Sequence, residues 1–246
     1  MRVVDFFVVG AMRSGTSTLT QCLSKHSDIF MLRNEPKFFS SWDGADRDSL
    51  DEYHARFDWN PRFVLRGEKS APYGPSLQAR DQIRAYNPQA KIIWMLRDPV
   101  KRAVSHFYRA YAASGDKAIS LKQAIAEKEG LEKRNHMWAY VYRSEYYKQI
   151  MHWLDVFPIS QVHLAVFEEM MRNPKAEIAR LCEFLGVDAR PEMYPEERAE
   201  NSKTTAQGIL AAPVEQDTLD ALYEALVPDI ESLFEFIGRR IPEWRR

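Results

Sequence analysis

The sequence predicts an α/β fold in which helices cover both faces of a central parallel β-sheet. Three short apolar runs with strand character, 3–9, 91–96 and 162–167, each precede a segment whose apolar residues recur at helical spacing. Strands that alternate with helices are typical of parallel sheets, because parallel neighbours need a crossover connection that is usually a helix. No interdomain linker is evident, so we expect a single domain over residues 1–246.

The first predicted strand, residues 3–9, opens a βαβ unit. It is rich in β-branched and aromatic residues and ends at Gly10. A helix is expected over 16–25, where Leu19 and Leu23 lie one turn apart. Strand, glycine loop and helix in this order predict that the loop presents its backbone N–H groups to an anion at the helix N-terminus.

The remaining elements repeat the alternation of strand and helix. The strand at 91–96 precedes a helix with Pro99 in its first turn, a position that proline favours. A helix on either side of the strand at 162–167 shows apolar residues at a helical period, and the second one stops at Gly186. The other expected elements are helices over 99–112, 146–157, 174–185 and 214–237 and a weak strand at 63–65.

Composition excludes several classes of protein. The chain carries 34 basic and 35 acidic side chains, whereas a general nucleic-acid-binding domain has a clear basic excess. Its two cysteines, Cys22 and Cys182, predict two buried thiols, and its six histidines show no metal-ligand spacing. No apolar run has the length of a membrane span, and the N-terminus lacks a cleavage-site pattern. We therefore expect a cytoplasmic protein that binds neither nucleic acid nor a metal, with its oligomeric state left open.

The loop GAMRSGTST, residues 10–18, has the glycine spacing of a phosphate-binding loop without its lysine. A loop for nucleoside triphosphates reads G-x-x-x-x-G-K-[ST], and here Thr16 stands in the position of the lysine. The cation is instead Arg13, inside the loop, and Ser17 and Thr18 add hydroxyl donors. A kinase would therefore lack its clamp on the β- and γ-phosphates, so the loop favours a different anion.

This loop is similar to the 5′-phosphosulfate loop of the sulfotransferases that use 3′-phosphoadenosine 5′-phosphosulfate (PAPS). The family usually has lysine at the position of Arg13, and arginine is common in its bacterial branches. The resemblance implies a P-loop-like three-layer fold, PAPS as co-substrate, 3′-phosphoadenosine 5′-phosphate (PAP) as product and no metal. It also implies that Arg13 stabilises the leaving phosphate electrostatically and that the donor is bound by Arg13, Ser14, Gly15, Thr16, Ser17 and Thr18.

A second anion-binding motif, KIIWMLRDPVKRAVSHFYR, occupies residues 91–109. Its strand ends at Arg97, and the following helix carries Ser105 eight residues later. An arginine at the carboxyl end of a strand projects toward the crevice where open α/β sheets bind ligands, and its planar fork suits a phosphate. The segment resembles the 3′-phosphate motif of the family, which implies that Arg97 and Ser105 bind the 3′-phosphate of PAPS. The alternative is an ion pair between Arg97 and Asp98 or another carboxylate.

The segment MLRNEPKFFSSW, residues 31–42, carries the expected catalytic base. It resembles the segment that supplies a glutamate base in glycan and heparan-type sulfotransferases, which implies that Glu35 deprotonates the acceptor. Lys37 and Ser40 stand where relatives often have His and Asp, so the surroundings of the base differ from the family pattern. The alternative is a surface glutamate that precedes a proline.

Two further segments resemble parts of the same family. GEKSAPYG, residues 67–74, is similar to its E-K-[ST]-x-x-Y segment, which implies that Lys69 neutralises charge on the transferring group or orients the acceptor. By the same resemblance, Glu68 holds Lys69 or contacts the substrate. ERAENSKTTAQ, residues 197–207, resembles the loop that closes over the 3′-phosphate and adenine. The contacts that this last resemblance implies are Asn201, Ser202 and Lys203, with an ordinary surface loop as the alternative.

The motifs together favour an enzyme that moves a sulfuryl group to a hydroxyl or amine, with Arg13, Glu35 and Lys69 as catalytic residues. The acceptor stays open among glycan, lipid-like, polyketide and small phenolic molecules. Two rival hypotheses are a P-loop kinase of a small metabolite and a non-catalytic relative that binds nucleotide or a partner protein.

Overall fold

The computed structural model describes residues 2–40, 49–114, 118–128, 138–194 and 213–244. The chain divides into two compact units, the first formed by residues 1–96 with 149–196 and the second by residues 97–148 with 197–246. The expected single domain over the whole chain stays a prediction.

The first unit contains a parallel sheet with β1 at its centre. Its strands are β1 (Phe6–Gly10), β2 (Ile29–Met31), β3 (Leu65–Lys69), β4 (Lys91–Leu96) and β5 (Val162–Val166). They follow the order β2-β3-β1-β4-β5, and every pair of neighbours is parallel. The chain first fills one side of β1 and then the other, so the strand order reverses between β1 and β4. Open α/β sheets bind ligands at the carboxyl ends of the strands at such a point.

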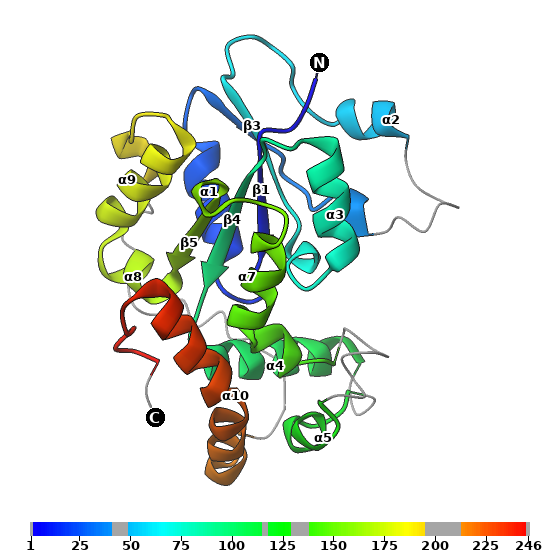
Figure 1. Cartoon of the computed structure of the whole chain (residues 1–246), viewed down its shortest axis with the longest axis vertical. Helices are drawn as coiled ribbons and strands as arrows, with labels where there is room; N and C mark the ends of the chain where they lie inside the picture. The colour runs from blue at the N-terminus through cyan, green and yellow to red at the C-terminus, as the bar shows by residue number, and fades with distance from the viewer. Residues whose placement is uncertain (1, 41–48, 115–117, 129–137, 195–212, 245–246) are drawn as a thin grey trace. The chain divides into compact units, whose positions relative to one another are not determined.

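Helices pack on both faces of this sheet, which confirms the predicted α/β class (Figure 1). Side chains alternate along a strand, so Phe6 and Val8 of β1 face one side and Phe7 faces the other. Phe6 and Val8 belong to a buried apolar cluster with residues of α1 (Thr16–Ser24) and α9 (Pro174–Leu185). Phe7 contacts the rings of Phe39 and Tyr86 on the opposite face. Those rings belong to the 3₁₀ turn η1 (Phe38–Ser40) and to α3 (Leu77–Tyr86).

The described regular elements of the second unit are helical. They include α4 (Pro99–Ser114), α5 (Leu121–Ala126), η4 (Tyr142–Ser144) and α10 (Gln216–Ile237). The described residues also form α2 (Leu50–His54), α7 (Tyr146–Leu154), whose residues from 149 belong to the first unit, and α8 (Phe167–Arg172). Within the described parts of the chain, no helix is long and apolar enough to cross a membrane.

Most of the expected elements are present, one strand is misplaced, and several elements were not predicted, among them the helices α2, α3, α5 and α8. The weak strand expected at 63–65 is wrong in position, because β3 occupies Leu65–Lys69. β3 reads LRGEK, which has little strand character, but Gly67 is needed there because a Cβ would lie 2.1 Å from the ring of Phe6. The three-residue strand β2 was not predicted. Both cysteines are buried and unpaired, as expected.

Candidate active site

The loop between β1 and α1 carries the predicted 5′-phosphosulfate residues. Gly15 is the N-cap of α1 with φ 88°, and a Cβ at this position would lie 2.5 Å from the ring of Phe167. Only glycine therefore fits, for conformational and steric reasons. Ser14 and Thr16 are buried, whereas the side chain of Ser17 is exposed.

Arg13 adopts an uncommon backbone conformation inside this loop. Its φ is 73°, in the left-handed region, and its side chain is exposed. A non-glycine residue held there is typical of binding loops and costs about 1 kcal/mol or more. The first turn of α1 contains no acidic residue, so the positive end of the helix dipole favours an anion beside Arg13.

Three predicted site residues from separate parts of the sequence meet beside this loop. Lys69 Nζ lies 2.9 Å from Glu35 Oε1 and donates a hydrogen bond of 3.4 Å to Ser17 Oγ. The side chains of Lys69 and Glu35 are 14% and 28% exposed, so the pair is partly shielded from water. An ion pair at this depth contributes roughly 1 kcal/mol or less to stability, so its importance lies in where it places the two charges.

The sheet explains how Lys69 reaches this position. It is the last residue of β3 and pairs in register with Val8 of β1, two residues before the loop begins at Gly10. Ser70 N then donates to Val8 O at 3.1 Å, and Gly74 N donates to Val9 O at 2.8 Å. The chain beyond Lys69 is thus held against the end of β1.

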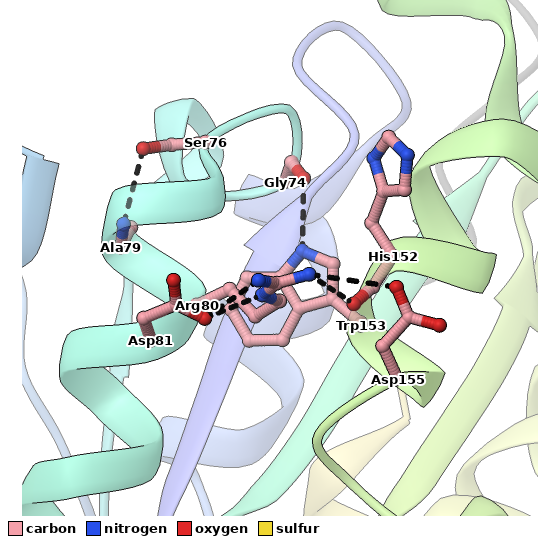
Figure 2. Close-up of polar contacts among 8 residues, drawn as sticks. All are labelled: Gly74, Ser76, Ala79, Arg80, Asp81, His152, Trp153 and Asp155. Atoms are coloured by element: carbon pink, nitrogen blue, oxygen red, sulfur yellow. Dashed lines mark hydrogen bonds and ion pairs between the residues drawn. The ribbon is translucent and has the colours of Figure 1, made fainter.

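Helix α7 holds the same turn from the other side, as Figure 2 shows. Trp153 Nε1 donates to Gly74 O at 2.9 Å. Arg80 on α3 donates to His152 O at 2.8 Å and pairs with Asp81 and Asp155 (Figure 2). A turn fixed by β1, α3 and α7 is a rigid support for Lys69.

The segment that carries Glu35 is anchored through its backbone. Lys37 N donates to Ser70 Oγ at 3.0 Å, and Phe39 N donates to Tyr73 Oη at 3.2 Å. The side chain of Lys37 is exposed and its φ is 52°, whereas Ser40 Oγ donates to Lys37 O at 3.0 Å. The two residues that depart from the family pattern therefore occupy different places, one on the surface and one in a local turn.

Glu68 lies behind this site and does not play the part expected of it. It is fully buried and accepts a hydrogen bond of 2.6 Å from Tyr53 Oη, so it neither holds Lys69 nor reaches a substrate. Burial raises the pKa of Glu68 to about 7, opposed by hydrogen bonds from the hydroxyls of Tyr53, Tyr73 and Ser70. Adjacent residues of a strand face opposite sides of the sheet. Because Glu68 and Lys69 are adjacent, this alternation predicts that only one of them faces the site.

Arg97 and Ser105 belong to the second unit. Arg97 follows the last residue of β4 in the chain, and its carbonyl accepts from Tyr146 Oη at 3.0 Å. Ser105 is half-buried on α4. Asp98, the alternative partner considered for Arg97, accepts from Lys101 N at 2.9 Å and so caps the start of α4.

A buried arginine anchors the helix that carries Ser105. Arg102 is fully buried and donates to Ser144 Oγ and to Tyr140 O, each at 2.6 Å. The basic run of the sequence around it gave no sign of this role.

The predicted contacts Asn201, Ser202 and Lys203 lie outside the described residues. In the described ranges, no group of three His, Cys, Asp or Glu side chains is placed to hold a metal ion.

Comparison with known proteins decides the family. A family model described as the sulfotransferase domain matches residues 4–207. The chain belongs to the sulfotransferase family. This membership confirms the predicted resemblance.

Relatives of this sulfotransferase include human enzymes and bacterial structures. It is 29% identical over 186 residues to human heparan sulfate glucosamine 3-O-sulfotransferase 6, with 76% of this chain and 53% of that protein covered. It therefore spans about half the length of this relative. A crystal structure of a sulfotransferase from Alicyclobacillus acidocaldarius is 29% identical, with a TM-score of 0.81 and full coverage of both chains. The sulfotransferase domain of the curacin biosynthetic pathway, at 16% identity and a TM-score of 0.56 over 98% of this chain, shares the fold.

Proposed function

We propose that this sulfotransferase moves a sulfuryl group from PAPS to a hydroxyl, or an amine, of its acceptor. The observation that carries the proposal is the meeting of Glu35, Lys69 and Ser17 beside a glycine loop at the point where the strand order reverses. A carboxylate, an ammonium and a loop of N–H donors are the groups that in-line transfer of an anionic group needs.

The proposed reaction is a direct displacement at sulfur. The acceptor oxygen forms a bond to sulfur, the bond from sulfur to the bridging phosphate oxygen breaks, and PAP leaves. Glu35 takes the acceptor proton as general base. Arg13 stabilises the negative charge on the leaving phosphate, and because arginine stays protonated its part is electrostatic only.

Lys69 has two partners in this proposal. It pairs with Glu35 at 2.9 Å, and the sulfuryl oxygens of a bound donor offer the ammonium a second anionic partner. Transfer of the ammonium toward the sulfuryl group leaves the Glu35 carboxylate available to accept a proton. Lys69 then neutralises charge on the transferring group, in keeping with its expected role.

The rest of the donor site is assigned from the family resemblance. The residues proposed for the 5′-phosphosulfate are Ser14, Gly15, Thr16, Ser17 and Thr18, together with Arg13. Arg97 and Ser105 are proposed for the 3′-phosphate, and Asn201, Ser202 and Lys203 for the 3′-phosphate and adenine. No step of the proposal uses a metal. The cytoplasmic location stays a prediction.

For the acceptor we propose a glycan that carries negative charge. The curated relatives are named as enzymes of heparan sulfate glucosamine, which supports a glycan hydroxyl as the target. Arg33 and Lys37 flank Glu35 and both are exposed, so two cations lie in the sequence on either side of the proposed base. Small-molecule and polyketide-type acceptors are the competing classes.

An acceptor screen with sulfur-labelled PAPS tests this proposal. Heparan-type oligosaccharides, phenols and long-chain alcohols are offered in parallel to the wild-type chain and to Glu35→Gln. We expect label on the oligosaccharides with the wild type and a rate lower by about a hundredfold or more with Glu35→Gln. Transfer to the phenols or alcohols alone would replace the glycan proposal. Transfer at the same rate by Glu35→Gln would remove Glu35 as the base.

A further inference from the structure

The chain just after Glu35 adopts an uncommon backbone conformation. Pro36 has no N–H group, so the first backbone donor after Glu35 is that of Lys37. Lys37 has a φ of 52°, in the left-handed region that non-glycine residues rarely adopt, and its carbonyl accepts from Ser40 N at 3.0 Å. Such a conformation persists only where the surrounding structure fixes it, so the contacts of this segment call for an explanation.

Two hydroxyl groups that follow β3 hold this segment. Lys37 N donates to Ser70 Oγ at 3.0 Å, and Phe39 N donates to Tyr73 Oη at 3.2 Å. Ser70 and Tyr73 are both fully buried, so their hydroxyls are shielded from bulk water. The rings of Phe39 and Tyr73 also contact each other, with 5.9 Å between their centroids. Hydrogen bonds to buried hydroxyls are costly to lose, because water does not readily replace them.

The turn that carries both hydroxyls is fixed to β1, the strand that leads into the glycine loop. Ser70 N donates to Val8 O at 3.1 Å, and Gly74 N donates to Val9 O at 2.8 Å. Tyr73 N donates to Ser70 O at 3.0 Å and so closes the turn. A continuous series of hydrogen bonds therefore connects the strand before the glycine loop with the segment of the proposed base.

These contacts place Glu35 relative to Lys69. Lys69 Nζ lies 2.9 Å from the Glu35 carboxylate, and the next residue, Ser70, binds the backbone two positions after Glu35. The ion pair is partly exposed and joins two flexible side chains, so by itself it fixes the carboxylate only weakly. The backbone bonds to the two buried hydroxyls restrict the segment far more.

We propose that Ser70 and Tyr73 are positioning residues whose hydroxyls hold the backbone at 37–39 and thereby hold the carboxylate of Glu35 beside Lys69. The proposal rests on the proposed function of Glu35 as the base. Both side chains are fully buried, so they act through Glu35 and not by contact with donor or acceptor. Loss of either hydroxyl therefore slows the chemical step and leaves donor binding unchanged.

The test compares two variants with two matched controls. Ser70→Ala and Tyr73→Phe each remove one hydroxyl and little else. Tyr86→Phe is the control for the tyrosine, because Tyr86 Oη also accepts from a backbone N–H group, at 2.9 Å. Ser120→Ala is the control for the serine, because Ser120 Oγ accepts from a backbone N–H group at 3.1 Å. Neither control residue donates to or accepts from the segment after Glu35 in the contacts named here.

Three measurements are made on each protein: the kcat and KM of sulfuryl transfer, the affinity for PAP by calorimetry, and hydrogen exchange of the Lys37 and Phe39 amides by NMR. For Ser70→Ala and Tyr73→Phe we expect kcat to fall about tenfold or more, with the KM for PAPS and the affinity for PAP within about twofold of wild type. Exchange of the amide that loses its partner should quicken. The controls should match wild type in every readout.

A double-mutant cycle with Glu35→Gln separates positioning of the base from general damage to the fold. If the two hydroxyls act through Glu35, their loss has nothing left to impair once the carboxylate is absent. In the Glu35→Gln background, Ser70→Ala and Tyr73→Phe should therefore change the residual kcat by less than about twofold. General damage would lower the rate by the same factor in both backgrounds.

The proposal is overturned by unchanged kcat or unchanged amide exchange in both variants, by an equal fall of kcat in the controls, or by additive losses in the cycle. Failure of the proposed function has a different signature. If the wild-type chain does not bind PAP, or if Glu35→Gln keeps the wild-type rate, the function assigned to the site is wrong. Exchange of the two amides then decides whether Ser70 and Tyr73 hold this segment.

Discussion

At the scale of single residues, the site depends on where three charges are placed. Lys69 and Glu35 are 34 positions apart in sequence and 2.9 Å apart in space, and Arg13 stands in the loop that follows the neighbouring strand. The Lys69–Glu35 pair is too shallow to matter much for folding. Its substitution should therefore report on chemistry more than on stability.

Substitution of Arg13 tests its electrostatic role. Arg13→Ala removes the cation beside the leaving phosphate and should lower kcat by about a hundredfold or more. Arg13→Lys keeps the charge and should retain most of that rate, since lysine is usual at this position in the family. The measurement is kcat with saturating PAPS, with Arg62→Ala as a control at an exposed arginine. A normal rate in Arg13→Ala would show that the charge is not used.

Substitution of Lys69 separates its role from that of a surface lysine. Lys69→Met keeps the aliphatic stem and removes the charge, so kcat should fall by about a hundredfold while the free energy of unfolding changes by less than about 1 kcal/mol. Steady-state kinetics and urea unfolding of the same preparation provide both values. A large loss of stability with unchanged kcat would reverse this assignment.

At the scale of elements, the strand–loop–helix unit 6–24 depends on one glycine. Gly15→Ala forces a side chain into a left-handed conformation and places its Cβ 2.5 Å from the ring of Phe167. The expected loss is about 2 kcal/mol or more in the free energy of unfolding, from strain and overpacking together. Chemical denaturation measures it.

Gly186→Ala is the matched control for Gly15→Ala. Gly186 also has a positive φ, of 81°, but a Cβ there would meet only the flexible end of Lys91, at 3.8 Å. Gly186→Ala should therefore lower the free energy of unfolding only by the conformational cost of the left-handed backbone, about 1 kcal/mol. Equal losses at the two glycines would show that the contact with Phe167 does not matter.

The sequence predicted the elements that have strong local signals. It missed those strands that form because they pair with neighbouring strands. β1, the glycine loop and α1 follow from an apolar run, Gly10 and the pair Leu19 and Leu23. β2 has three residues, and β3 is a strand because it pairs with β1 and β2 and not because LRGEK favours it. Without β3 in place, neither the approach of Lys69 to Glu35 nor the burial of Glu68 can be predicted.

At the scale of the whole molecule, Glu68 should make stability depend on pH. Burial raises the pKa of its carboxyl from 4.5 to about 7, so between these values the folded chain keeps a proton that the unfolded chain has lost. Stability therefore falls as pH rises from about 4.5 to about 7 and is level above that. The contribution is about 3 kcal/mol.

Other groups with shifted pKa values titrate near this range, among them Asp229 and His163, so the comparison must be made between variants. Burial raises the pKa of Asp229 to about 6 and lowers the pKa of His163 to about 4, and these shifts act in opposite directions on the slope. Glu68→Gln leaves both in place. As the pH rises from 4.5 to 7, the unfolding free energy of the wild type should fall relative to that of Glu68→Gln. A difference independent of pH would mean that Glu68 is ionised throughout.

The central claim, that the chain uses PAPS through its glycine loop, has a test that needs no acceptor. Titration calorimetry with PAP and with ADP, each with and without magnesium, compares the two nucleotides directly. The account predicts that PAP binds at least about tenfold more tightly than ADP, with no dependence on magnesium. Equal affinity for PAP and ADP, or magnesium-dependent binding of ADP, would contradict it.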